Sequence, residues 1–203
     1  MIILNVAQGS PEWFAARAGI PTASNFDKIV TSKGERSAQA QKYLYQLAGE
    51  RLAGEPSETY QNGAMLRGKE LEPIARSAYS FITDNVVEEV GFCLEEGERY
   101  GCSPDGLIGD YERNGLIEIK CPTLPVAVEY LDKGGLPTTY FQQVQGQLLV
   151  TGCEWCDFFS YYPGLPPLLV RVGRDEKFLK ALQTELAAFC DELDALTERL
   201  RQK

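Results

Sequence analysis

The chain carries near its middle the stretch Leu116-Ile117-Glu118-Ile119-Lys120-Cys121-Pro122. Its β-branched residues favour a short strand, and Pro122 is expected to close it because proline cannot donate to a sheet. Side chains two residues apart in a strand point to the same face, so Glu118 and Lys120 project together while Ile119 points away. An acid and a lysine in such a strand fit two interpretations: a half-exposed ion pair, or a site that uses both charges.

Upstream of this strand, Asp105 lies in Ser103-Pro104-Asp105-Gly106, a sequence typical of a tight turn. The stretch from Asp105 to Glu118 has the length of a hairpin, which would bring both carboxylates to one end of a sheet. With the backbone carbonyl of Ile119 and water, they would form an oxygen cage suited to magnesium. Lys120 would then be able to orient a metal-bound water or neutralise charge that develops on a phosphoryl group.

The sequence contains no histidine. This excludes the nucleophilic triads that depend on histidine, histidine-ligated zinc and histidine as a general base. Metal chemistry therefore has to use oxygen ligands, which select magnesium or manganese before zinc.

The charge balance is acidic, with a formal net charge of −9 and an isoelectric point near 4.7. A uniformly acidic surface would repel a phosphate backbone. Either the substrate is not nucleic acid, or basic residues gather on one face while acidic residues cover the rest. Net charge alone does not decide between the two, because binding depends on the local field.

A length of 203 residues predicts one domain spanning residues 1–203. We find no apolar run of about 18 residues that would span a bilayer and no basic, cleavable leader, so the expected location is the cytoplasm. In that compartment the six cysteines are expected to be reduced, and Cys153 and Cys156 to be packing residues rather than a zinc or redox pair.

The pattern of apolar residues predicts an α/β or α+β domain, with helices flanking one sheet. Serine and proline at 10 and 11 predict the start of a helix that ends near Gly19, followed by a short helix from Thr22 to Val30 and a basic loop at 32–37. Further helices are expected at 38–53, 64–82, 140–150 and 175–202, and strands at 86–94, 116–121, 155–162 and 168–172. The helix at 64–82 is expected to bury Met65, Leu66, Leu71, Ile74, Ala75 and Tyr79.

An aspartate, a spacer and Glu-x-Lys form the signature of the PD-(D/E)XK nuclease superfamily, which Asp105 and Glu118-Ile119-Lys120 match. Neighbouring motifs narrow the resemblance to the phage lambda exonuclease, or YqaJ-type viral recombinase, family. In chain order these are residues 8–20 (QGSPEWFAARAGI), Thr22-Ala23-Ser24, Gly68-Lys69 with Glu72, residues 102–107 (CSPDGL), residues 118–122 (EIKCP) and residues 140–145 (YFQQVQ). The resemblance covers roughly residues 5–162.

This resemblance implies a PD-(D/E)XK (restriction-endonuclease-like) core with a central mixed sheet flanked by helices. It further implies a 5′-to-3′ exonuclease that degrades one strand of linear double-stranded DNA with Mg²⁺, two ions per site, and leaves a 3′ overhang for recombination. Mn²⁺ is expected to substitute for Mg²⁺. One implied partner is a single-strand annealing protein, and two further copies of the chain are implied to complete a trimeric ring. The protein is expected to be encoded by a phage or prophage and to act in a bacterial host.

Residue by residue, the resemblance makes Asp105, Glu118, the Ile119 carbonyl and the helical Glu72 metal ligands, and Lys120 the catalytic lysine. It places Arg17, Ser24, Ser103 and Gln143 around the 5′-terminal phosphate. Lys33 and Arg36 offer a basic loop, and we interpret Trp13 as a core residue.

Three alternatives remain open from the sequence. One is a different nuclease of the superfamily, Cas4-like or endonucleolytic, although the cluster of cysteines that holds iron and sulfur in the Cas4-like enzymes is missing. Another is a non-catalytic module that binds DNA ends. The third is an interaction protein that uses the apolar face of its long C-terminal helix, against which stands burial of that face in the core.

Overall fold

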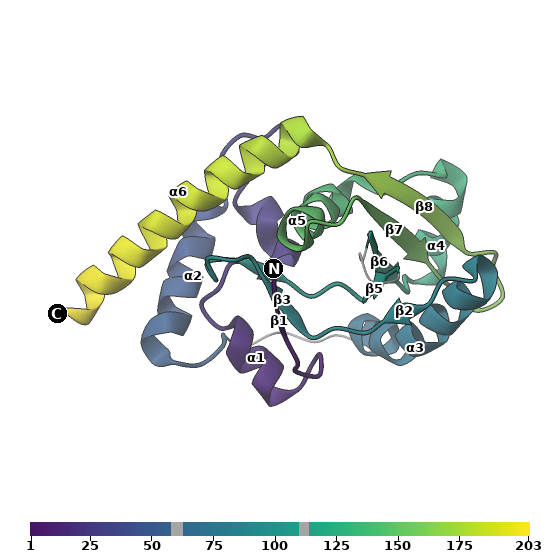
Figure 1. Ribbon diagram of the computed structural model, residues 1–203, viewed down its shortest axis with the longest axis horizontal. Helices are drawn as coiled ribbons and strands as arrows, with labels where there is room; N and C mark the ends of the chain where they lie inside the picture. Colours follow the sequence, from purple (N-terminus) through teal and green to yellow (C-terminus); the bar gives the residue numbers. More distant parts are fainter. Residues whose placement is uncertain (58–62, 110–113) are drawn as a thin grey trace.

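The computed structural model describes residues 1–57, 63–109 and 114–203, and its largest element is a five-stranded mixed sheet (Figure 1). The strand order is β2-β5-β6-β7-β8, with β6 and β7 parallel and every other neighbouring pair antiparallel. The strands are β2 (Val87–Glu88), β5 (Gly106–Ile108), β6 (Gly115–Lys120), β7 (Trp155–Ser160) and β8 (Leu168–Gly173). The predicted strands at 116–121, 155–162 and 168–172 are thereby confirmed. The predicted hairpin joins β5 to β6, and its residues 110–113 lie outside the described ranges.

A second, three-stranded sheet has the order β1-β3-β4, formed by β1 (Ile2–Leu4), β3 (Phe92–Leu94) and β4 (Gly101–Cys102). The single strand predicted at 86–94 is therefore wrong, because its two ends belong to different sheets. The chain changes sheet at Gly91, where an added Cβ would lie 2.2 Å from the Val6 carbonyl oxygen. Only glycine allows the two backbones to approach so closely.

Helices cover both sheets. They are α1 (Pro11–Arg17), η1 (Ala23–Lys28), α2 (Ala40–Ala53), α3 (Gly63–Thr83), α4 (Leu124–Lys133), η2 (Thr138–Tyr140), α5 (Phe141–Thr151) and α6 (Glu176–Arg201). Helix α4 was not predicted; it ends at Gly134 in the left-handed conformation. In the residues that the structure describes, no helix combines the length and the apolar character needed to cross a membrane.

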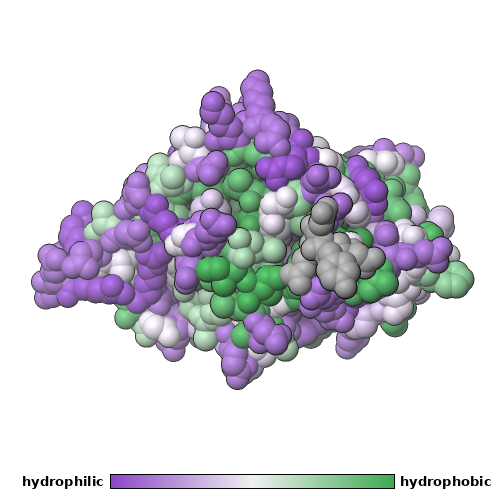
Figure 2. Space-filling view, viewed as in Figure 1, coloured by the Kyte–Doolittle hydropathy of each residue, from purple (hydrophilic) through white to green (hydrophobic). Residues whose placement is uncertain are grey.

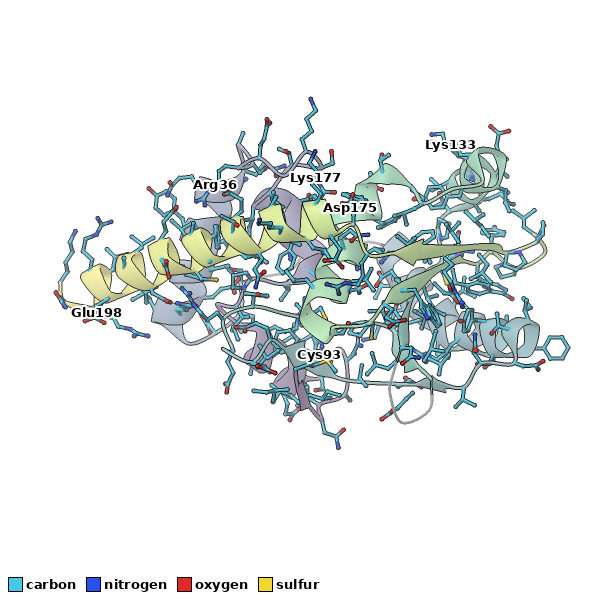
Figure 3. The ribbon with its side chains drawn as sticks, turned by 45° about the horizontal axis from the view of Figure 1, so that its top comes forward. Arg36, Cys93, Lys133, Asp175, Lys177 and Glu198 are labelled. Carbon is cyan, nitrogen blue, oxygen red and sulfur yellow. The ribbon has the colours of Figure 1, made fainter. Side chains whose placement is uncertain are left out.

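Helix α6 packs its apolar side into the main core, against α2 and α5. Asp175 caps its first turn by accepting a hydrogen bond from the Phe178 N–H at 3.0 Å. Figure 3 shows Asp175 at the start of α6 and Glu198 near the other end, which projects beyond the body of the protein and is covered by hydrophilic residues in Figure 2. The C-terminal helix therefore buries its apolar face in this chain, as the simpler of the two interpretations had it.

Alternate residues of β6 face opposite helices. Ile117 and Ile119 pack with Ala75 and Tyr79 of α3, while Leu116 belongs to the main core on the side of α5. Because Glu118 and Lys120 share the direction of Leu116, they point away from α3.

The predicted core face of α3 is confirmed only in part. Ala75 and Tyr79 are fully buried, but Leu66 and Ile74 are 50% and 52% exposed. The sheet covers a narrower stripe of the helix than the apolar periodicity predicts. The side chain of Met65 lies outside the described set.

Helix α1 begins and ends as predicted. Ser10 Oγ accepts a hydrogen bond from the Trp13 N–H at 3.2 Å, and Pro11 occupies the first turn. The turn after the helix is held by α2, since the Gly19 N–H donates to Glu50 Oε2 at 2.8 Å and Arg51 Nε donates to the Gly19 carbonyl at 2.8 Å. These contacts fix the end of α1, where Arg17 is the last helical residue.

A buried polar cluster joins the sheet to α3. Asp157 of β7 is 1% exposed and accepts hydrogen bonds from the Tyr79 hydroxyl at 2.7 Å and from Arg171 Nε and Nη2 at 2.8 and 2.9 Å. Arg171 also lies over the Trp155 ring, 3.7 Å from its centroid. Each polar atom of this cluster depends on the same carboxylate.

We expect Asp157→Ala to destabilise the fold by about 2 kcal/mol, because it leaves the buried Tyr79 hydroxyl without its acceptor. In a chain of this size that lowers Tm by about 4–8 °C. Thermal unfolding followed by circular dichroism measures the change. Glu129→Ala, which removes an exposed i,i+4 ion pair with Lys133, should leave Tm within about 2 °C of wild type. Equal effects of the two substitutions would contradict the importance of the buried cluster.

Candidate active site

The turn before β5 and the strand β6 bring Asp105 and Glu118 together. Gly106 pairs with Ile117 in the antiparallel register, and the Asp105 N–H continues the ladder by donating to the Ile117 carbonyl at 3.1 Å. In return, the Ile119 N–H donates to Asp105 Oδ2 at 2.6 Å. Both carboxylates line one cavity of about 190 Å³, together with Lys120. They lie on the same side of the sheet, as the predicted oxygen cage requires.

Glu118 is held at both of its oxygens and is 1% exposed. Gln143 Nε2 of α5 donates to Oε1 at 2.6 Å, and the Lys120 ammonium forms a short contact with the same oxygen. Gln147 Nε2, one turn further along α5, donates to Oε2 at 2.6 Å. A buried carboxylate with three donors is a fixed group rather than a rotating surface acid.

Glu72 reaches the site from α3. Arg76, one turn later, donates to Glu72 Oε1 at 2.6 Å and to the Asp105 carbonyl at 3.2 Å, so it ties the helix to the turn before β5. Glu72 and Asp105 both line a second, larger cavity of about 710 Å³, which also shares Gln8 and Trp13 with the smaller one.

The three carboxylates of the site influence one another through their charges. Burial raises the pKa of Asp105 well above its usual value, and the charges of Glu118 and Glu72 raise it further. Burial also raises the pKa of Glu72, with Arg76 opposing and Glu118 reinforcing the shift. Burial alone would lower the pKa of Lys120, but Glu118 and Asp105 outweigh it and raise the pKa. Lys120 is therefore an ammonium at neutral pH.

This donor set fits a hard divalent cation. It consists of oxygens only, and its negative charges repel one another unless a cation lies among them. Within the described ranges no three His, Cys, Asp or Glu side chains are already gathered as a metal-binding group. Lys120 and Arg76 supply the positive charge that lies beside these carboxylates. Asp105, Glu118 and Glu72 remain predicted metal ligands.

The predicted phosphate residues share the smaller cavity with this acidic centre. Arg17, Ser24, Ser103 and Gln143 all line it. Arg17 Nη1 donates to Ser103 Oγ at 3.1 Å, and its guanidinium stacks over the Trp13 ring, 4.1 Å from the centroid. Gln143 lines the cavity, but its amide is used by Glu118.

Arg17 is a half-buried cation whose pKa is lowered by its burial. In the part of the chain that the structure describes, no carboxylate forms a salt bridge with it. A guanidinium held away from water without an acid partner is an attractive site for an anion.

Three other arginines, in contrast, form ion pairs with acids of α6. Arg36 donates to Glu192 of α6 at 2.6 Å, and Figure 3 shows Arg36 beside that helix. The basic loop predicted at 32–37 therefore has one of its charges satisfied within the chain. Arg51 and Arg99 likewise donate to Asp194 and Asp191 of α6, each at 2.6 Å.

Four residues of the site were missed or misjudged from the sequence. Trp13 is half-buried and lines both cavities, so its interpretation as a core residue is wrong; its indole N–H donates to Ser103 Oγ at 2.9 Å. Gln8 Nε2 donates to the Pro104 carbonyl at 2.8 Å and steadies the turn that carries Asp105. Arg76 and Gln147 were also overlooked. The i,i+4 spacing of Gln147 from Gln143 and of Arg76 from Glu72 was the available signal.

Comparison with known proteins finds a matching family model and similar solved structures. The model of a family described as the YqaJ-like viral recombinase domain matches residues 12–154. An alkaline exonuclease (LHK-Exo) from Laribacter hongkongensis is 40% identical, with a TM-score of 0.85 and coverage of 95% of this chain and 97% of that one; its complex with dAMP matches equally well. A phage-related exonuclease from Haemophilus somnus 129PT has the same fold at 17% identity, with a TM-score of 0.66 and coverage of 89% and 96%.

A viral protein is also related. Uncharacterized protein R354 of Acanthamoeba polyphaga mimivirus is 33% identical in an alignment of 114 positions, with coverage of 49% of this chain and 20% of that protein. The match thus spans about a fifth of the length of the mimivirus relative.

The crowded carboxylates predict a gain in stability when one charge is removed. Asp105→Asn keeps an oxygen to accept the Ile119 N–H and relieves the repulsion from Glu118 and Glu72. Relief of about 1 kcal/mol would raise Tm by about 2–4 °C at pH 7 in EDTA, as measured by differential scanning fluorimetry. Asp132→Asn, at an exposed position of α4, is the control and should not change Tm.

The difference in stability between Asp105→Asn and wild type should depend on pH. The pKa of Asp105 is raised in the fold, so its ionisation destabilises the protein above that pKa. The advantage of the asparagine variant should therefore shrink as the pH falls and Asp105 becomes protonated. A variant less stable than wild type at pH 7 would contradict the described electrostatics.

Proposed function

The chain belongs to the YqaJ-like viral recombinase family, and from this membership we propose that it is a magnesium-dependent 5′-to-3′ exonuclease acting on linear double-stranded DNA. It degrades one strand and leaves a 3′ overhang for recombination by strand annealing. The observation that carries the proposal is the single small cavity that holds both Arg17 and the Asp105–Glu118–Lys120 group. An anion-binding cation beside a hydrolytic centre suits a substrate whose strand end is itself a phosphate.

The size of the cavity supports action at an end. About 190 Å³ accommodates a phosphate and part of a sugar but not a duplex. Arg17, with the hydroxyls of Ser103 and Ser24, would bind the 5′-terminal phosphate, and Gln143 would line the same space. Anchoring the terminal phosphate sets how far the next phosphodiester lies from Asp105 and Glu118, so that cleavage removes one nucleotide at a time.

Asp105, Glu118, Glu72 and the Ile119 carbonyl would hold two Mg²⁺, for which Mn²⁺ can substitute. When bound, the ions supply the positive charge that activates water and stabilises the leaving oxygen. Water attacks the phosphorus in line, and the bond to the 3′ oxygen breaks and leaves a 3′ hydroxyl on the released nucleotide. The remaining strand keeps a 5′ phosphate, which is again a ligand for Arg17.

Lys120 would contribute a positive charge to catalysis and would not act as a proton acceptor. Its raised pKa keeps it protonated, and it lies against Glu118 with the Tyr140 ring 5.0 Å away. From that position the ammonium neutralises negative charge that develops on the phosphoryl oxygens.

Residues 1–203 would act as one nuclease domain in the cytoplasm of a bacterial host, in a phage- or prophage-encoded system. We further propose a homotrimeric ring and a single-strand annealing partner. A ring would reconcile the net charge of −9 with DNA binding, because acidic residues can cover its outside while basic residues line the channel.

The proposal predicts strand-specific digestion. A linear duplex carrying a label at one 5′ or one 3′ end should lose the 5′ label first in Mg²⁺, as followed on a denaturing gel. Glu118→Ala and Lys120→Ala should reduce digestion by at least about 10³-fold while circular dichroism shows a retained fold. Early release of the 3′ label, or cleavage of a closed circle, would favour another nuclease of the superfamily; binding of ends without hydrolysis would favour a non-catalytic module.

The proposed role of Arg17 predicts that DNA ends are selected by their 5′ phosphate. Arg17→Ala should erase most of the preference for a 5′ phosphate over a 5′ hydroxyl, because the charge-assisted contacts to the terminal phosphate are lost. Rates on the two kinds of end, compared in single-turnover reactions, measure this ratio. Arg99→Ala removes an arginine already paired with α6 and should leave the ratio unchanged. An unaltered ratio in the Arg17 variant would show that the terminal phosphate binds elsewhere.

A further inference from the structure

Gln147 lies beside Glu118 and is among the residues that line the smaller cavity. It is on α5, it is 1% exposed, and its Nε2 donates to Glu118 Oε2 at 2.6 Å. Its own Oε1 is the one buried side-chain nitrogen or oxygen atom in the described residues that has no hydrogen-bond partner. A buried oxygen that accepts no hydrogen bond is unfavourable, because it has lost its contact with water without a replacement.

The neighbouring Gln145 shows what a structural glutamine on this helix looks like. It is equally buried at 1% exposed, yet both ends of its amide are paired. Nε2 donates to the Gly173 carbonyl at 2.9 Å, and Oε1 accepts from the Asp175 N–H at 2.9 Å. Gln145 therefore joins α5 to the start of α6, whereas Gln147 makes its single bond to a carboxylate of the active site.

Chemistry fixes the orientation of the Gln147 amide. An ionised Glu118 offers only acceptor atoms, so the NH₂ group must face it and the amide oxygen must face away. Gln143 donates to the other oxygen of Glu118 from one turn earlier on the same helix. The two amides of α5 therefore each hold one oxygen of the carboxylate and restrict its rotation about the Cγ–Cδ bond.

We propose that Gln147 is a positioning residue for metal binding: it holds Oε2 of Glu118 so that Oε1, beside Lys120, is presented to the cavity shared with Asp105. The inference rests on the proposed metal-dependent function. Without Gln147, Glu118 can rotate and divide its time between orientations that do not favour a cation. The unsatisfied amide oxygen is the cost of directing the only donor group of Gln147 at Glu118.

The test measures metal binding directly and does not rely on activity. Gln147→Met preserves the length and apolar volume of the side chain but removes the donor. Mn²⁺ affinity, determined by electron paramagnetic resonance of free Mn²⁺, should fall by about 10-fold or more, the range expected when a partner of a metal ligand is lost. Gln147→Asn, which keeps the amide but is too short to reach Glu118, should show the same loss.

Gln145→Met is the matched control on the same helix. It removes two satisfied hydrogen bonds and should lower Tm more than Gln147→Met does, while its Mn²⁺ affinity stays within about twofold of wild type. This contrast separates positioning from general support of the helix, since a merely structural role would not move metal affinity without moving Tm.

The outcomes are distinguishable. If wild-type protein binds Mn²⁺ and the folded Gln147 variants bind it equally well, the positioning role is overturned and the proposed nuclease function stands. If folded wild-type protein binds no Mn²⁺, the metal-dependent function fails and the role of Gln147 fails with it.

Discussion

The Ile119 N–H donates to Asp105 Oδ2, and this hydrogen bond ties the turn before β5 to the strand β6. It holds one carboxylate opposite another, an arrangement that like charges oppose. The fold compensates with donors from three elements: Lys120 from the strand itself, Gln143 and Gln147 from α5, and Arg76 from α3. Packing around the sheet thus stabilises a cluster of charges that would separate in an open chain.

The arginines of the chain differ in whether they are paired with an acid. Several arginines of the body form ion pairs with acids on α6, so that helix neutralises the chain's own cations as well as contributing to its core. Arg17 is placed differently, between an indole ring and two hydroxyls. Whether an arginine forms an ion pair with an acid of the chain, more than the net charge of the protein, distinguishes a cation that supports the fold from one that is available to a ligand.

Local sequence rules predicted the parts of the site that depend on local geometry. The two-residue period of a strand correctly placed Glu118 and Lys120 on one face, and the Pro-Asp-Gly turn correctly placed Asp105 beside them. Tertiary contacts explain the failures. The split of residues 86–94 depends on Gly91 meeting Val6, which no local pattern contains. Gln145 and Gln147 are alike in sequence context, and only their partners distinguish them.

The small volume of the cavity at Arg17, about 190 Å³, determines under the proposed function which DNA molecules the protein can degrade. Under the proposed function, entry requires a free terminus, and a covalently closed circle has none to insert. Side chains that bind only a free end would therefore also spare an intact replicon without reading any base. Selectivity of this kind would come from the requirement for a free end and would need no sequence-specific contact.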